Sequence, residues 1–328
     1  MKLSRHWVWG FKLAVTIGVL AYLFRDLDWA VLREEFSRLH LGWYALAVTI
    51  TLAGLAITAL RWRLLLGVQK LVLPVRKAFT LTFIGIFFNA FFLGSTGGDI
   101  SKWYYIAREH PEHKARAILS VIMDRAIGLI SLLFLGLLVL PWQARILWEH
   151  EETKIFAVAL IIMFILAAAT ILALLAFPFH RLPAYLQQKW QKIPGNDLAR
   201  TLLRGFRAHG EEGRLTLSAL ALSLILQFFL ILGGWSLAHA LQISITLPQI
   251  VLILVMVQIA ASLPISIGGH GIREAAMVLL FTAFSIAPAA NATALTETAV
   301  AFSLLFFSLQ LWGNLLGGLL YLTRPDRR

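Results

Sequence analysis

Cysteine is absent from the sequence, and only 14% of its 328 residues are charged. The absence of cysteine excludes disulfide bonds and thiolate metal sites. The scarcity of charge, combined with 59% hydrophobic residues and a mean hydropathy of +0.78, excludes an ordinary water-soluble globular domain. The sequence therefore predicts an all-α integral membrane protein, with residues 1–328 forming a single polytopic membrane domain.

Six apolar runs are long enough to cross a hydrocarbon core of about 30 Å, which takes about 20 residues. They are Trp7–Phe24, Leu41–Leu60, Ala117–Leu140, Ile155–Phe177, Leu215–Ala240 and Thr298–Leu322. The first is long for a signal peptide and lacks a small-residue cleavage site, so we interpret it as an uncleaved span. The longest polar stretch, His180–Arg214, is expected to be a loop, which leaves no segment for a soluble transferase domain.

Acidic residues are few, with 17 Asp and Glu against 29 Lys and Arg. The basic residues stand in loops between apolar runs, which indicates membrane topology rather than binding to nucleic acid. Lys and Arg accumulate in cytoplasmic loops of membrane proteins. We therefore expect both termini to be cytoplasmic. The membrane is expected to be the cytoplasmic (inner) membrane of a bacterium or archaeon.

Two glycine-containing motifs align without a gap, FLGSTGGDISKW at 92–103 and LPISIGGHGIRE at 263–274. Each follows a further apolar run, Ala78–Leu93 or Pro248–Leu263. The matched positions are Ser95 with Ser266, Gly97 with Gly268, Gly98 with Gly269, and Lys102 with Arg273.

The charge of the loops predicts how these motifs meet the membrane. If residues 78–103 crossed it, every later loop would change sides and the seven basic residues between Arg181 and Arg214 would lie outside. We therefore predict a re-entrant hairpin at about 78–116 that enters from the cytoplasm. A second hairpin, at about 248–285, enters from outside by the same count. The predicted fold has about six full transmembrane helices and two oppositely oriented re-entrant hairpins, which form an inverted repeat.

Helices that begin again after Gly98 and Gly269 would point free backbone N–H groups and a positive dipole end at one central volume. Lys102 and Arg273 follow about one turn later. Such a place suits an anionic headgroup, so membrane lipids are the expected ligands.

Charged residues inside apolar runs add further candidates, because ionised groups there are costly and usually face protein or water. Asp124 and Arg125 either balance the charge of a cavity, with Asp124 pairing with Lys102 or Arg125, or lie at the headgroup level. For the same reason, Arg273 and Glu274 are expected to face the protein interior or water. By contrast, Gly313 and Gly317 suit a helix-packing face.

Three polar residues complete the candidate site. Asn89 and Gln258 precede the two motifs and either bind the broken backbone or contact substrate. His270 has no second ligand at metal spacing and is interpreted as a polar cavity residue; no metal or cofactor is expected. The candidate substrate-binding residues are Asn89, Ser95, Gly97, Gly98, Asp99, Lys102, Asp124, Arg125, Gln258, Ser266, Gly268, Gly269, His270, Arg273 and Glu274.

The stretches FFNAFFLGSTGGDISKWYYIARE, VIMDRAIGL and LPISIGGHGIREAAM, in this order, resemble the flippase-like family related to the transmembrane region of lysylphosphatidylglycerol synthases. The resemblance implies the translocation of a lipid headgroup between leaflets. It also implies that conserved family positions fall on twelve residues of this chain. These are Asn89, Gly97, Gly98, Asp99, Lys102, Asp124, Arg125, Gly268, Gly269, Gly271, Arg273 and Glu274.

We thus expect flippase-like transport of an anionic phospholipid or a polyprenyl-phosphate-linked lipid. The alternative is a non-transporting membrane accessory or scaffold of a lipid-modifying enzyme or glycosyltransferase, which would then be its partner. Enzymatic activity is not expected, because no complete catalytic constellation is visible. The synthase activity is not carried over either, because the chain ends just past its last predicted span.

Overall fold

Helices form all the regular elements in the part of the chain that the computed structural model describes, which is residues 29–91, 97–149, 151–176, 205, 208–262, 271–286 and 295–323. In chain order they are α2 (Trp29–Ser37), α3 (Leu41–Val68), α4 (Val75–Phe91), α5 (Gly97–Glu109), the 3₁₀ turn η2 (Pro111–His113), α6 (Lys114–Glu149), α7 (Glu151–Ala176), α10 (Gly213–Ala240), α11 (Leu247–Ser262), α12 (Ile272–Ala283) and α13 (Leu295–Leu322).

Five of these helices, α3, α6, α7, α10 and α13, are long and apolar enough to cross a membrane. They coincide with five of the six predicted spans; the sixth, Trp7–Phe24, lies outside the described residues. The prediction of an all-α integral membrane protein is confirmed.

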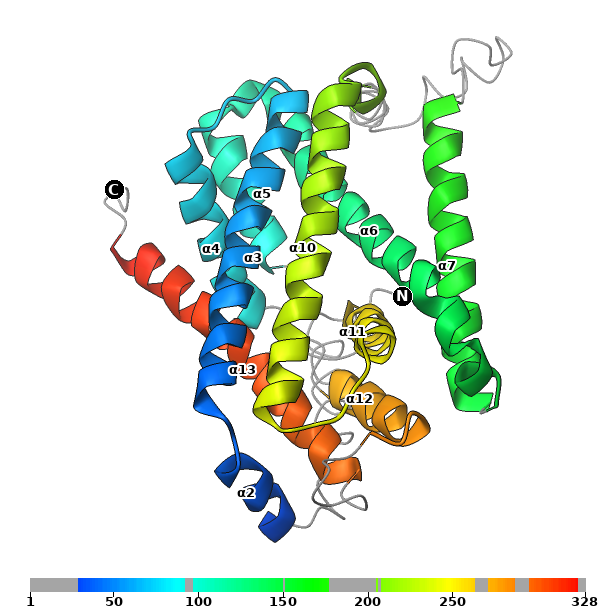
Figure 1. Cartoon of the computed structure of the whole chain (residues 1–328). Helices are drawn as coiled ribbons and strands as arrows, with labels where there is room; N and C mark the ends of the chain where they lie inside the picture. Colours follow the sequence, from blue (N-terminus) through cyan, green and yellow to red (C-terminus); the bar gives the residue numbers. More distant parts are fainter. Residues whose placement is uncertain are drawn as a thin grey trace, which may run out of the picture.

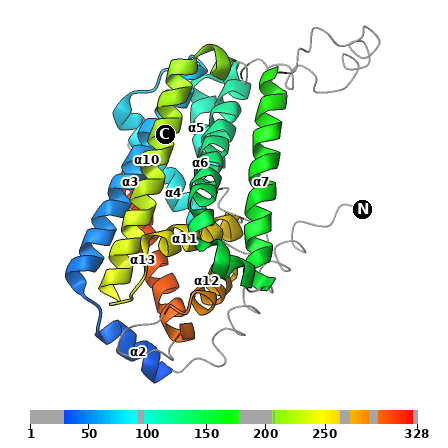
Figure 2. The same ribbon diagram turned by 45° about the vertical axis from the view of Figure 1, so that its right-hand side comes forward.

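The long helices α3 and α10 lie side by side and run in opposite directions (Figures 1 and 2). At one end, the backbone N–H of His40 donates to the carbonyl oxygen of Ala240 at 2.8 Å. At the other end, Gln69 Nε2 donates to the carbonyl oxygen of Gly205 at 2.9 Å, shortly before α10 begins. The helices that follow α3 and α10 therefore start from opposite ends of the bundle.

Two pairs of short helices come after these long ones: α4 and α5 follow α3, and α11 and α12 follow α10. In the first, α4 has 17 residues and α5 has 13, and Lys77 Nζ, near the start of α4, lies 2.6 Å from Glu109 Oε1 at the end of α5. The pair therefore forms an antiparallel hairpin that returns to the end where it began. In the second pair, α11 has 16 residues and α12 has 12, and the two pack together. All four are shorter than the about 20 residues of a full crossing.

Helix α11 is enclosed by protein. Every residue from Ile250 to Val257 is buried, on all sides of the helix. It packs against α6, α10 and α12. An apolar helix of a membrane protein could equally face lipid, so the burial of α11 on every side, and not its composition, places it inside the bundle. Helix α11 therefore lies in the core rather than at the rim.

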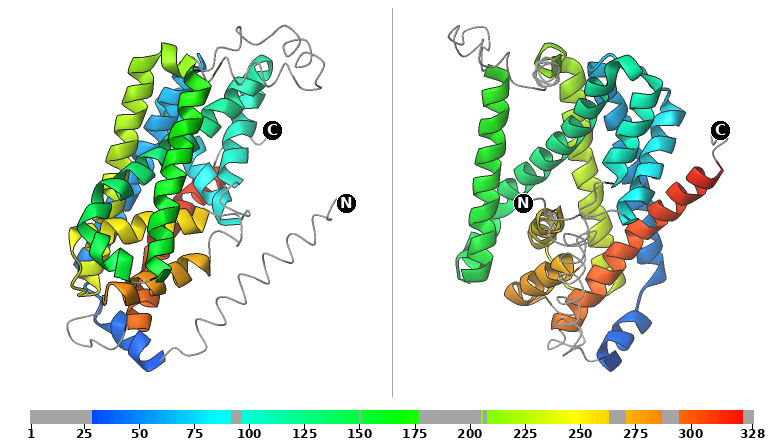
Figure 3. Two further views of the ribbon diagram at one scale, coloured as in Figure 1. Left: turned by 90° about the vertical axis from the view of Figure 1, so that its right-hand side faces the viewer. Right: turned by 180° about the vertical axis from the view of Figure 1, so that it is seen from behind.

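Helix α13 crosses the bundle obliquely, and the C-terminal part of α13 packs against α4 (Figure 3). A methyl group on Gly317 would lie 2.0 Å from the carbonyl oxygen of Phe83 on α4, and one on Gly313 would lie 2.4 Å from Leu55 Cδ1 on α3. At Gly317 two helix backbones meet, which only glycine permits, whereas at Gly313 the neighbour is the end of a leucine side chain. The prediction that Gly313 and Gly317 form a packing face is confirmed.

Candidate functional site

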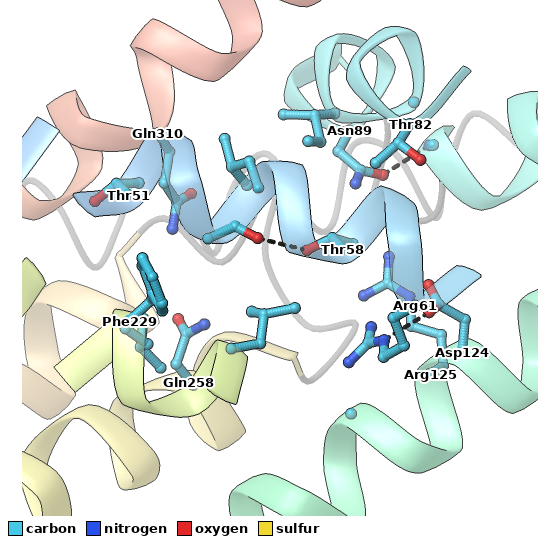
Figure 4. A pocket seen from close by; sticks show the side chains of 18 of the residues that line it. Thr51, Thr58, Arg61, Thr82, Asn89, Asp124, Arg125, Phe229, Gln258 and Gln310 are labelled. Atoms are coloured by element: carbon cyan, nitrogen blue, oxygen red, sulfur yellow. Dashed lines mark hydrogen bonds and ion pairs between the residues drawn. The ribbon is translucent and has the colours of Figure 1, made fainter. Parts of the chain in front are cut away.

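A cavity of about 710 Å³ lies inside the bundle, between α3, α4, α5, α6, α10, α11 and α13 (Figure 4). One end is charged and is formed by Arg61, Asp99, Lys102, Asp124 and Arg125. The other end carries uncharged side chains, and Figure 4 shows Thr51, Phe229, Gln258 and Gln310 there. Its size falls in the range of small-molecule binding sites.

A buried ion network forms the core of the charged end. Asp124 on α6 accepts from Arg61 Nε of α3 at 2.8 Å through Oδ1, and from Lys102 Nζ of α5 at 3.4 Å through Oδ2. The three residues are only 5%, 7% and 6% exposed, respectively. Arg61 Nη1 also donates to Ser223 Oγ on α10 at 2.8 Å. One carboxylate thus joins α3, α5 and α6, and its arginine extends the network to α10.

Local sequence places each member of this network. Lys102 stands one turn after the start of α5 at Gly97, and its ammonium lies 4.9 Å from the ring centroid of Trp62, the residue after Arg61. Gly128, one turn after Asp124, leaves room for the guanidinium, because a methyl group there would lie 3.3 Å from Arg61 Nη1. The absence of a side chain at Gly128 therefore lets Arg61 approach α6.

A second ion pair at the same end is more accessible. Arg125 Nε lies 2.7 Å from Asp99 Oδ2, and the two side chains are 52% and 23% exposed. Asp124 therefore pairs with Lys102 and Arg61, whereas Arg125 pairs with Asp99 of α5. The described lining carries three cationic side chains against two carboxylates, so the cavity has an excess of positive charge.

Asn89, near the end of α4, joins that helix to the start of α5. Its Oδ1 accepts from the backbone N–H of Gly98 at 2.7 Å, so it satisfies one of the N–H groups that the start of a helix leaves free. Gly98 also faces Gly85 of α4 so closely that a methyl group on Gly98 would lie 2.4 Å from the carbonyl oxygen of Gly85. Of the two roles open for Asn89, the structure shows the backbone contact, and Asn89 also lines the cavity.

Arg273 and Glu274 form a separate buried pair at the start of α12. The guanidinium contacts Oε1 of Glu274, donates to Ser303 Oγ at 3.3 Å and lies 4.9 Å from the ring centroid of Phe307. Glu274 Oε2 accepts from the backbone N–H of Gly271 at 2.6 Å, and Gly271 has a φ of 82°, which favours glycine. Phe307 lines the cavity, whereas Arg273 and Glu274 are not among its described lining residues. This pair therefore stabilises the start of α12 next to the cavity wall.

The remaining predicted residues divide into two groups. Gln258 lines the cavity, and Gly97 is buried at the start of α5. Ser95, Ser266, Gly268, Gly269 and His270 lie outside the described residues. Within the described ranges, no three His, Asp or Glu side chains come together in a way that could hold a metal ion.

Several lining residues are absent from the sequence-based candidates. Arg61 is the most important of them. The apolar run Leu64–Leu66 after it indicates that the helix continues past Leu60, where the predicted span ends. The others are uncharged residues of apolar helices, which hydropathy alone does not distinguish. They include Thr51, Thr58, Gln227, Gln310 and Asn314.

A bundle of helices that are long and apolar enough to span a membrane, with a charged cavity between them, defines a polytopic membrane protein. The family description "lysylphosphatidylglycerol synthase TM region" matches residues 9–318, and the chain belongs to this family. The resemblance identified from the sequence motifs is therefore confirmed. No curated protein and no solved structure shows significant similarity to the chain.

Proposed function

We propose that this protein translocates an anionic lipid between the leaflets of a membrane, in the manner of a flippase, with the headgroup passing through the internal cavity. The observation that carries the proposal is the excess of cationic side chains in a cavity that lies between candidate membrane spans and the short helices α4, α5 and α11. Charged groups at such depth are costly, and packing alone does not require them. The family name, which refers to the membrane region of an enzyme that makes a modified phospholipid, supports a lipid ligand.

The short helix pairs suggest how the chain is arranged in the membrane. We propose that α4–α5 and α11–α12 are re-entrant hairpins that enter from opposite faces and complete an inverted repeat with six full spans. Their short lengths and their starts at opposite ends of the bundle support this arrangement. The basic ends of α4, α5 and α6 would face the cytoplasm of a bacterial or archaeal cell, together with both termini.

Cysteine labelling tests this topology, and the cysteine-free sequence provides the background. Single cysteines at the exposed positions Arg76, before the first hairpin, and Lys114, after it, should react with an impermeant maleimide from the cytoplasmic side only. A cysteine at Glu151, whose side chain is 80% exposed at the start of α7, should react from the opposite side. Labelling of the cysteines at positions 76 and 114 from opposite sides would overturn the hairpin.

Transport is tested in proteoliposomes that contain fluorescent phosphatidylglycerol, phosphatidylcholine or a polyprenyl phosphate, with and without an ion gradient. The proposal predicts faster exchange of the anionic lipids than of phosphatidylcholine. It also predicts that the purified protein leaves each lipid chemically unchanged, because we propose a transporter and not an enzyme. Folded protein that moves none of these lipids would refute transport and favour the accessory or scaffold role beside a lipid-modifying enzyme.

A further inference from the structure

The uncharged end of the cavity contains more polar groups than a path for lipid phosphate requires. Gln258 lies on α11, and Gln310 and Asn314 lie on α13, whereas Gln227 of α10 also lines the cavity but lies closer to the charged end, where it donates to the carbonyl oxygen of Gly128. Thr51 and Thr58 of α3 join these four amides in the lining. Polar side chains inside spanning helices are costly unless they have hydrogen-bond partners, so four helices that direct them to one space point to a ligand.

Several of these side chains have hydrogen-bonding atoms that no described protein group engages. Gln258, Gln310 and Asn314 have no hydrogen-bond partner among the residues that the structure describes. Gln227 uses its Nε2 to donate to the carbonyl oxygen of Gly128 at 3.2 Å, which leaves its carbonyl oxygen as an acceptor. Thr51 donates to the carbonyl oxygen of Ala47 at 2.8 Å and keeps its acceptor lone pairs. Together, these groups present both donors and acceptors to the cavity.

Such a lining matches hydroxyl groups, because a hydroxyl donates one hydrogen bond and accepts others, as a carboxamide side chain does on its two atoms. It suits an ammonium group less well, because an ammonium only donates and would leave the N–H donors of the amides unpaired. The two carboxylates of the described lining are already engaged, Asp124 by Arg61 and Lys102, and Asp99 by Arg125. An ammonium headgroup would therefore meet an excess of positive charge and no carboxylate outside an ion pair.

We propose that the uncharged end of the cavity recognises a hydroxyl-rich, uncharged headgroup, either a polyol or a sugar, joined to a phosphate that lies at the charged end. This proposal rests on the proposed function and defines its substrate class. Phosphatidyl polyols and polyprenyl-phosphate sugars share this chemistry. Lipids whose headgroup carries an ammonium are disfavoured.

Binding to the purified full-length protein in detergent tests the proposal, with a competition assay against one labelled anionic lipid. Phosphatidic acid supplies the phosphate alone; phosphatidylglycerol and phosphatidylinositol add a polyol, and phosphatidylethanolamine adds an ammonium. Polyprenyl phosphate with and without a hexose forms a second series. We expect the hydroxylated member of at least one series to bind about tenfold more tightly than its parent phosphate, and phosphatidylethanolamine to bind more weakly than phosphatidic acid. The series that shows the gain identifies the source of the headgroup.

Variants connect this preference to the amides. Gln258→Leu and Gln310→Leu should each reduce the gain for the hydroxylated lipid about three- to tenfold, which corresponds to one or two neutral hydrogen bonds; the gain is the ratio of the affinities for the hydroxylated lipid and its parent phosphate in the same variant. Both should retain thermal stability, because replacing an amide that has no protein partner by an apolar group of similar size is tolerated. Gln143→Leu, on α6 outside the cavity lining, is the matched control and should change neither quantity.

The outcomes separate the two proposals. Equal binding of parent and hydroxylated lipids, tighter binding of phosphatidylethanolamine, or an unchanged preference in both variants would overturn the headgroup assignment and leave anionic lipid transport intact. Absence of binding by every anionic lipid, together with absence of transport, would overturn both.

Discussion

Replacing Asp124 by asparagine is expected to lower the free energy of unfolding by about 3–5 kcal/mol, because it leaves two buried cations without their carboxylate. Arg61 and Lys102 are both nearly inaccessible to solvent, and Asp124 is the carboxylate that contacts them. Removing one partner of a buried pair costs far more than the pair contributes when intact. Unfolding of the purified protein in detergent, followed by circular dichroism, measures the loss.

Two control variants define the cause. Asp99→Asn breaks the neighbouring pair with Arg125, which is partly exposed, and should cost no more than about 1 kcal/mol. Asp124→Asn combined with Lys102→Met restores the net charge of the network and should recover much of the loss. If Asp124→Asn were as stable as Asp99→Asn, the buried network would not exist as described.

Replacing Gly98 by alanine is expected to destabilise the first hairpin by about 1–3 kcal/mol through overpacking. The added methyl group would lie 2.4 Å from the carbonyl oxygen of Gly85 and 2.8 Å from Asn89 Oδ1. Backbone atoms of α4 cannot move aside as the end of a flexible side chain can. We therefore expect α5 to shift and the hydrogen bond from the Gly98 N–H to Asn89 to weaken. Lys102, one turn further along α5, should then lose its alignment with Asp124, so transport should fall together with thermal stability.

Gly67→Ala provides the matched control, because no atom beyond the adjoining backbone of α3 lies within 4 Å of the position of the added methyl group. This change should leave stability unchanged or raise it by as much as about 1 kcal/mol, since alanine favours a helix more than glycine does. Equal stability of Gly98→Ala and Gly67→Ala would contradict the close approach of α4 and α5.

Hydropathy predicted the helical class and five spans that the structure contains, because the length of an apolar run is a local signal in the sequence. The orientation that loop charge indicates stays a prediction. The pairing of Lys102 with Asp124 could also be predicted, since both charges stand in or next to apolar runs. Arg61 was not identified because the hydropathy falls at Arg61 and Arg63, so the run appeared to end at Leu60. Its partner Asp124 is 63 residues away, and only the packing of α3 on α6 shows that the arginine is buried.

The alignment of the two motifs was informative but incomplete. It matches Lys102 with Arg273, yet Lys102 pairs with Asp124 on another helix, whereas Arg273 pairs with its neighbour Glu274. The aligned sequences already contain the reason, because Trp103 stands where the second motif has Glu274. A similar backbone motif therefore does not give its cation the same partner.

Helix α4 is fixed on two sides by glycine contacts, against Gly98 of α5 and Gly317 of α13. At both contacts backbone meets glycine, so no side-chain rotamer change can loosen α4 from its neighbours. We therefore expect α4, α5 and α13 to move as one rigid body. Any alternation of access to the cavity would then depend on sliding or tilting of the helices across from this unit, α6, α10 and α11, which meet the cavity through longer side chains such as Leu129, Leu230 and Gln258.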